Sequence, residues 1–310
     1  MKVLLIGATG AVGTPLVSQF VARGHEVVGT SRTRERADTL RELGATPAVL
    51  DVLDRDGVRR LVFDTNPDAI VHQATALAGG IDFRHFAESF AQTNRLRTEG
   101  TDNLLAAAKE AGVRRFVAQS YAGWPHARVG GRIKSEEDPL DDHPPEAVRS
   151  TLAAIKHLEA AVVGAGGLAL RYGAFYGAPV DPALDAIRER KIPIVGDGGG
   201  IFWFVHVEDA ASATVLALER GEPGIYNVTD DEPAPAREVL PALAEAVGAR
   251  PPRKVPVWLA RLFAGELGVI MGTQLRGASN VKAKRELGWT LRYPSWRDGF
   301  AAETAVAQAA

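Results

Sequence analysis

The chain has 310 residues, of which 46% are hydrophobic and 24% are charged, an ordinary composition for a folded globular protein. Its 36 Lys and Arg against 38 Asp and Glu give a net charge of −2, which argues against a nucleic acid or an anionic membrane as the main partner. There is no cysteine, so disulfides, thiolate catalysis and cysteine metal sites are excluded, and no metal site is predicted. No stretch approaches the roughly 20 apolar residues of a membrane span, so we expect a soluble cytoplasmic protein.

Short apolar runs alternate with amphipathic stretches over the first half of the chain. Buried strands are predicted at 3–8, 25–31, 45–52, 69–75, 114–120 and 167–177. Helices are predicted at 12–22, 34–43 and 101–113, and a strand end leads into a helix over 204–220. Apolar strands separated by helices are typical of parallel strands buried on both faces. The sequence therefore predicts an α/β fold with a Rossmann-type doubly wound parallel sheet.

The segment GATGAVG places Gly7, Gly10 and Gly13 between the first predicted strand and the first predicted helix. Glycine permits a tight turn and lets the backbone approach a ligand closely. A helix that begins behind such a loop offers free N–H groups and a positive dipole end to a pyrophosphate. In this position the motif predicts dinucleotide binding, and the alternative is a packing turn without a ligand.

The end of the second predicted strand bears on which dinucleotide is bound. An Asp there would accept hydrogen bonds from both ribose hydroxyls and favour NAD, but the segment GTSRTRER has Ser31 and Arg32 instead. A hydroxyl and a guanidinium suit a 2′-phosphate, so NADP(H) is favoured over NAD(H). Asp51 ends the third predicted strand and either accepts from the adenine amino group or caps the strand, and both alternatives stay open.

The regular alternation of strands and helices lapses after about residue 176, where Pro and Gly become more frequent. The sequence predicts a dinucleotide-binding lobe of residues 1–176 plus about 200–228. A smaller C-terminal substrate lobe is predicted at about 177–199 and 229–310. No flexible linker is recognisable, so the chain is expected to cross between the two lobes.

Eight segments occur in a fixed order over nearly the whole chain. They are GATGAVG, LDV at 50–52, VHQATA at 71–76, GTDNLLAAAKEAGVRRFVAQS at 100–120, LRYGAFYG at 170–177, FVHVEDAASA at 204–213, GIYNVTDDE at 224–232 and KAKRELGW at 282–289. In these segments the chain resembles the extended short-chain dehydrogenase/reductase family, of the NAD(P)-dependent epimerase/dehydratase type. The ordered set is specific for the fold and much less so for the reaction.

The resemblance implies a set of cofactor contacts. The pyrophosphate is assigned to the loop residues Gly7, Thr9, Gly10, Ala11, Val12 and Gly13. The adenosine ribose is assigned to Ser31 and Arg32, and the adenine to Asp51 and Val52. Ala74 is expected near the nicotinamide ribose, and Tyr172 flanks the loop expected near the nicotinamide.

The resemblance also likens Ser120 to the family's catalytic hydroxyl and Lys156 to the lysine of its Tyr-x-x-x-Lys motif. In that motif the tyrosine transfers a proton, while the lysine binds the nicotinamide ribose and lowers the tyrosine pKa. Here Leu152 stands four residues before the lysine, and Arg97 stands where the family has an asparagine. Tyr121 is the candidate proton donor, and the alternative is that it packs over the cofactor crevice.

The sequence therefore predicts an NADP-dependent oxidoreductase of the atypical extended short-chain type that acts on a small organic carbonyl or hydroxyl substrate. A redox-neutral epimerase or dehydratase, for example of the sugar-nucleotide type, is one alternative. A non-catalytic NADP-sensing protein is another. His126 and His143 are expected at the surface, and a homodimer stays open as the assembly.

Overall fold

The computed structural model describes residues 1–77, 80–82, 85–177 and 182–309. A sheet of seven parallel strands forms its centre, in the order β12-β7-β5-β4-β1-β2-β3. The strands are β1 (Lys2–Ile6), β2 (Glu26–Ser31), β3 (Thr46–Val49), β4 (Ala69–His72), β5 (Arg115–Tyr121), β7 (Leu168–Tyr172) and β12 (Gly224–Val228). The predicted Rossmann-type α/β fold is confirmed.

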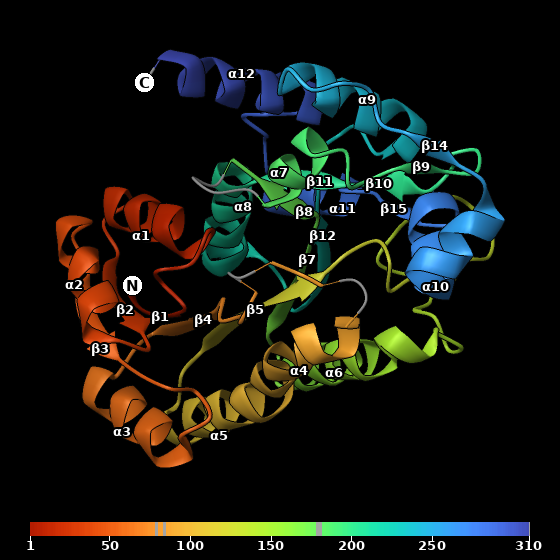
Figure 1. The fold of residues 1–310 in the computed structure, drawn as a ribbon. Helices are drawn as coiled ribbons and strands as arrows, with labels where there is room; N and C mark the ends of the chain where they lie inside the picture. The colour runs from red at the N-terminus through yellow and green to blue at the C-terminus, as the bar shows by residue number, and fades with distance from the viewer. Residues whose placement is uncertain (78–79, 83–84, 178–181, 310) are drawn as a thin grey trace.

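Both faces of the sheet are covered by helices, as Figure 1 shows. One face carries α1 (Gly13–Ala22), α2 (Arg34–Glu42), α8 (Val207–Arg220) and α11 (Val281–Leu287). The other face carries α3 (Arg55–Thr65), α4 (Phe86–Arg95), α5 (Thr101–Ala111) and α6 (Glu146–Gly164), and a π-helical turn, η2 (Leu96–Gly100), joins α4 to α5. None of the helices in the described part of the chain is long and apolar enough to span a membrane.

The apolar sequences of the central strands follow from this double cover. Val3 and Leu5 of β1 pack in the core on the α1 side, whereas Leu4 and Ile6 pack in the core on the α3 side. Successive side chains of a strand point to opposite faces, so a strand buried on both faces must be apolar throughout. The same alternation decides which side each residue of β5 faces.

The rest of the described chain forms short strand pairs and three longer helices. The pairs join β8 (Ala174–Tyr176) to β11 (Phe204–His206), β9 (Ile194–Val195) to β14 (Lys254–Val255), β10 (Ile201–Phe202) to β13 (Ala234–Pro235), and β6 (Ile133–Lys134) to β15 (Gly277–Ala278). The helices are α9 (Ala236–Ala246), α10 (Val257–Thr273) and α12 (Trp296–Ala309), with a short α7 (Pro182–Arg188). In Figure 1 α9 and α12 lie together, and α10 lies beyond one end of α6.

The predicted division into lobes stays a prediction. Strand β12 lies at the edge of the central sheet beside β7, as expected for the segment 200–228. However, Ala283, Leu287 and Trp289 pack in the large core on the α1 side, although they fall in the predicted C-terminal lobe. The segment that contains these three residues therefore packs on the central sheet, although the sequence analysis assigns it to the C-terminal lobe.

Candidate active site

The glycine loop turns tightly between β1 and α1. Gly7 has a φ of +80°, and a Cβ there would lie 2.9 Å from the backbone nitrogen of Ala74, so the loop packs closely on the end of β4. A Cβ on Gly13 would overlap the carbonyl oxygen of Gly7. Among the described residues, none accepts a hydrogen bond from the amides of Ala11 and Val12. The start of α1 therefore keeps free donors for an anion.

Polar and cationic groups gather at the end of β2. Ser31 is the last residue of the strand and is buried, while Arg32 is exposed and forms no ion pair with any described residue. Arg36 reaches back from α2, and its Nη2 donates to the carbonyl oxygen of Thr9 at 3.0 Å. The guanidinium of Arg36 thereby lies at the rim of the glycine loop.

The end of β3 provides a further edge of the same site. Asp51 is exposed, and its Oδ1 accepts from the backbone N–H of Leu53 at 3.0 Å, which is the capping role weighed for it. Val52 is buried, and its carbonyl oxygen accepts from Nδ2 of Asn103 at 3.0 Å. Because the other oxygen of Asp51 accepts no hydrogen bond from a described residue, capping by Oδ1 leaves an acceptor for a ligand. Together with the free amides of the loop, these residues fit a bound dinucleotide.

Ser120 is buried inside the protein. Phe116 and Ala118 of β5 face the core on the α6 side, so the alternation puts Ser120 on that side as well. Its hydroxyl donates to Oε1 of Glu159 on α6 at 2.6 Å, and the residue is 1% exposed. Glu159 also accepts from Nε and Nη2 of Arg171 on β7, each at 2.7 Å. The candidate catalytic hydroxyl therefore donates a hydrogen bond to the buried ion pair of Glu159 and Arg171.

His126, which the sequence analysis expects at the surface, is instead fully buried and extends this network. Nη1 of Arg171 lies 3.3 Å from Nε2 of His126, and an arginine N–H can only donate. Nε2 is then the acceptor, and Nδ1 donates to the carbonyl oxygen of Gly123 at 3.1 Å. Burial, and next the charge of Arg171, lower the pKa of His126 to about 4, so the ring is neutral at physiological pH.

Tyr121 follows Ser120 at the end of β5 and lies among aromatic side chains. Its ring centroid is 6.3 Å from that of Trp124 and 6.1 Å from that of Trp203. Burial raises the pKa of the Tyr121 phenol to about 12, and the positive charge of Arg97 opposes this rise. At neutral pH the phenol is protonated, so it is able to donate a proton but is a poor base.

Helix α6 presents neither a phenol nor an ammonium to the end of β5. Glu159 faces β5, and helical geometry puts Ile155 and Thr151, one and two turns earlier, on the same face. Both residues are fully buried, and the hydroxyl of Thr151 accepts from Nδ2 of Asn94 on α4 at 3.2 Å. On this face of α6, Thr151 and Ile155 therefore supply a hydroxyl and an aliphatic side chain.

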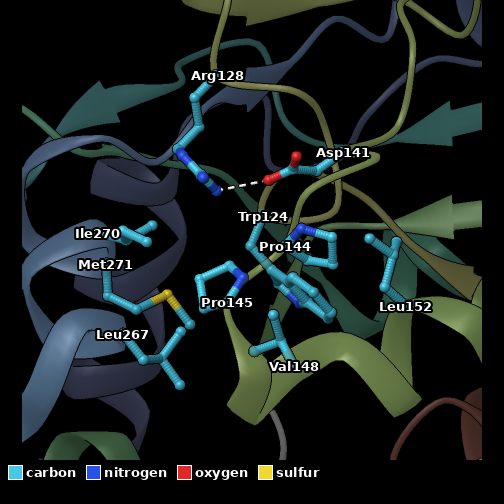
Figure 2. Close-up of a pocket in the computed structure, with 10 residues that line it drawn as sticks. All are labelled: Trp124, Arg128, Asp141, Pro144, Pro145, Val148, Leu152, Leu267, Ile270 and Met271. Atoms are coloured by element: carbon cyan, nitrogen blue, oxygen red, sulfur yellow. Dashed lines mark hydrogen bonds and ion pairs between the residues drawn. The ribbon is translucent and has the colours of Figure 1, made fainter.

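Leu152 and Lys156 lie on a neighbouring face of α6. Figure 2 shows Leu152 with Trp124 and Val148 in an apolar pocket that Leu267 of α10 also lines. The ammonium of Lys156 is 2.8 Å from Oδ1 of Asp142, and its side chain is 40% exposed. The predicted contact of Lys156 with the nicotinamide ribose is therefore without support from its position.

Tyr172 belongs to the core of the nucleotide-binding lobe. It is fully buried, and its hydroxyl accepts from Nε2 of Gln73 at 2.9 Å and shares a 2.6 Å hydrogen bond with Thr214. Its hydroxyl is thus engaged by two protein groups, and its expected place near the nicotinamide stays a prediction. His206 instead caps α8, because its Nδ1 accepts from the backbone N–H of Glu208.

Sequence reasoning missed Glu159, Arg171 and Thr151 as members of the site. The sequence did contain a signal for this arrangement. Phe116, Ala118 and Ser120 alternate along one strand and so share a face. Thr151 precedes Glu159 by two helical turns, which puts both on one face of a helix. The buried Glu159 and Arg171 could have been paired only by knowing that α6 covers β7. That proximity is a property of the tertiary fold.

The fold and this site define a dinucleotide-dependent α/β enzyme. A family model described as the NAD dependent epimerase/dehydratase family matches residues 3–229, and the chain belongs to this family. It is 42% identical to a 3-diazoavenalumate denitrifying reductase of a Streptomyces species, over 98% of this chain and 100% of that protein. It is also 29% identical to a 2-alkyl-3-oxoalkanoate reductase of Stenotrophomonas maltophilia, over 80% of this chain and 76% of that protein.

A solved structure of an enzyme in complex with NAD has the same fold as this chain. The structure is similar to that of UDP-glucose 4-epimerase from Thermus thermophilus in complex with NAD, with a TM-score of 0.75, 27% identity and 100% coverage of both chains. The chain is therefore an NAD(P)-dependent oxidoreductase of the extended short-chain type.

Proposed function

We propose that the protein is an NADP(H)-dependent reductase of small aromatic substrates, and that an aryl diazo group is the hydride acceptor it serves best. The observation that carries this proposal is the set of residues at the end of β5. Thr151 and Ile155 face that strand end from α6, and Tyr121 is the phenol beside it. A cationic diazonium group accepts a hydride without prior protonation, so it does not need the proton donor that a carbonyl needs.

The residues that would hold the cofactor are those of the glycine loop and the strand ends next to it. The free amides of Ala11 and Val12 would bind the pyrophosphate. Ser31 and the exposed Arg32 would bind a 2′-phosphate, and the absence of an acid at the end of β2 supports NADP(H) over NAD(H). Ala74 lies against Gly7, where the loop meets the end of β4.

When bound, the reduced nicotinamide would supply the hydride that converts an aryl diazonium group to an aryl diazene, which then loses dinitrogen to leave the arene. The substrate class follows the name of the 42% identical relative, a 3-diazoavenalumate denitrifying reductase. Trp124, Trp203 and Tyr121 supply flat aromatic surfaces for such a substrate and exclude water from it.

Reduction of a ketone or aldehyde is the second candidate. It is favoured by the protonated Tyr121 phenol, which is able to donate to a developing alkoxide. It also agrees with the name of the 2-alkyl-3-oxoalkanoate reductase. In this reaction Tyr121 is required, whereas in the diazo reaction it is not.

The test compares para-carboxybenzenediazonium with para-carboxybenzaldehyde in the wild type and in Tyr121→Phe, with NADPH consumption as the readout. We expect stoichiometric NADPH oxidation and dinitrogen release with the diazonium ion, and a less than about threefold loss of that rate in the variant, because removal of a proton donor that is not used leaves the barrier unchanged. A faster reaction with the aldehyde that Tyr121→Phe slows about 100-fold would establish the second candidate.

Controls separate the remaining alternatives. Turnover without net consumption of NADPH would establish a redox-neutral epimerase or dehydratase. Binding of NADPH with no turnover of any aromatic acceptor would establish a binding protein. Wild-type NADPH affinity in Tyr121→Phe checks that the variant is folded.

A further inference from the structure

Arg97 is a buried cation that forms no ion pair with any described residue. It lies in η2 and is 3% exposed, and its Nε and Nη1 have no hydrogen-bond acceptor among the described residues. Burial of a charge without an opposite charge beside it costs free energy. A bound anion would compensate that cost. The guanidinium lies over the face of Phe90, with its central carbon 5.9 Å from the ring centroid.

The charged groups near Arg97 are already engaged or neutral. Glu159 is close enough to interact with it electrostatically, but this carboxylate accepts two hydrogen bonds from Arg171 and one from Ser120. Burial lowers the pKa of His72 to about 4, so that ring is neutral and offers no negative charge. Tyr121 is the other neighbour, and it is protonated at neutral pH.

Unpartnered polar atoms concentrate around this arginine. Nδ1 of His72, Oδ1 of Asn94 and Oγ1 of Thr101 are also buried without partners among the described residues. They come from β4, α4 and α5, which meet at the carboxyl end of the sheet where such folds bind ligands. Buried polar atoms without partners are rare in folded proteins, so this cluster indicates a place completed by a ligand.

Aromatic side chains adjoin the arginine and lead away from it. Phe90 stacks on Phe86 with 4.4 Å between ring centroids, and Phe86 meets Trp124 edge to face at 6.0 Å. Trp124 lines the pocket shown in Figure 2 and also neighbours Tyr121. A flat aromatic ligand that packs along these rings would bring one end toward Arg97.

We propose that Arg97 is a substrate-binding residue, whose guanidinium takes a carboxylate of an aromatic substrate by paired hydrogen bonds from Nε and a terminal nitrogen. The planar fork of a guanidinium matches the two oxygens of a carboxylate, and exclusion of water strengthens the pair. The proposal rests on the proposed function, because it assumes an aromatic substrate in the same crevice.

The test measures binding of trans-cinnamate and of its uncharged amide, cinnamamide, to the NADP⁺-saturated protein by titration calorimetry. The wild type is expected to bind the acid at least about tenfold more tightly than the amide, the effect of one charge-assisted hydrogen bond. Arg97→Met is expected to abolish that preference and to leave NADP⁺ affinity unchanged. Arg128→Gln is the matched control, since Arg128 lines the pocket but already pairs with Asp141 at 2.6 Å.

The melting temperature of the apoprotein separates a binding role from a structural one. An unpaired buried cation destabilises the fold, so Arg97→Met is expected to melt at or above the wild-type temperature. Equal affinity of the wild type for acid and amide would overturn the proposal, as would a preference that survives in Arg97→Met. Loss of NADP⁺ affinity in Arg97→Met would show that the arginine serves the cofactor. These readouts need no turnover, so they stay informative if the diazo reaction fails.

Discussion

The buried ion pair between Glu159 and Arg171 gives the most direct test of the assignment of Ser120 to the protein interior. The variant Glu159→Gln keeps the size of the side chain but removes its charge. The Arg171 guanidinium then stays buried, 3% exposed, opposite a neutral amide whose NH2 group faces a donor.

The expected loss of stability follows from the hydrogen bonds of this carboxylate. Glu159 accepts one bond from Ser120 at 2.6 Å and two from Arg171 at 2.7 Å. A hydrogen bond to a charged group contributes about 1.5–3 kcal/mol, and glutamine retains one acceptor oxygen. At the position of Oε1 that oxygen keeps the bonds from Ser120 and from Nε of Arg171, so the bond from Nη2 is lost and the guanidinium charge is left unpaired. Removal of one partner from a buried pair costs roughly 3–5 kcal/mol.

Urea unfolding followed by circular dichroism measures this loss. The double variant Glu159→Gln/Arg171→Met, which removes the orphaned cation, is expected to recover at least half of it, because a buried pair replaced by neutral groups is often tolerated. Ser120→Ala is the milder control, with an expected loss of about 1–2 kcal/mol and little change in turnover. A cost below about 1 kcal/mol for Glu159→Gln, or a double variant less stable than the single one, would refute this reasoning.

Three further predictions concern the cofactor and pH. Lys156→Met is expected to change the KM for NADPH less than about threefold, because the ammonium pairs with Asp142; a rise above about tenfold would restore the ribose-binding role. Arg32→Gln is expected to raise the KM for NADPH about tenfold and leave that for NADH unchanged, and an equal effect on both would contradict a 2′-phosphate contact. Burial raises the pKa of the Asp230 carboxyl from 3.8 to about 8. The folded protein then holds a proton that the unfolded chain releases, so stability falls as the pH rises from about 4 to about 8. Urea unfolding at about pH 5 and about pH 8 should show that Asp230→Asn removes this fall, and an unchanged pH dependence would count against it.

The sequence by itself determined the fold class and the cofactor loop. Both depend on local pattern, since apolar runs identify strands covered on two faces and the glycines of GATGAVG fix a turn before a helix. The placement of Arg32 after the second strand, and thus the preference for NADP(H), is also a local prediction that stays to be measured.

Only the tertiary structure decided the surroundings of the candidate catalytic residues. Ser120 faces Glu159, 39 positions away, and Lys156 turns to a loop acid instead of the strand end. One residue along a helix rotates a side chain by about 100°, so the difference between Leu152 and Thr151 separates an apolar pocket from the end of β5. The lack of an acceptor for Nε and Nη1 of Arg97 among the described residues is likewise invisible in the sequence, because it depends on which groups from β4, β5 and α6 come close to the arginine.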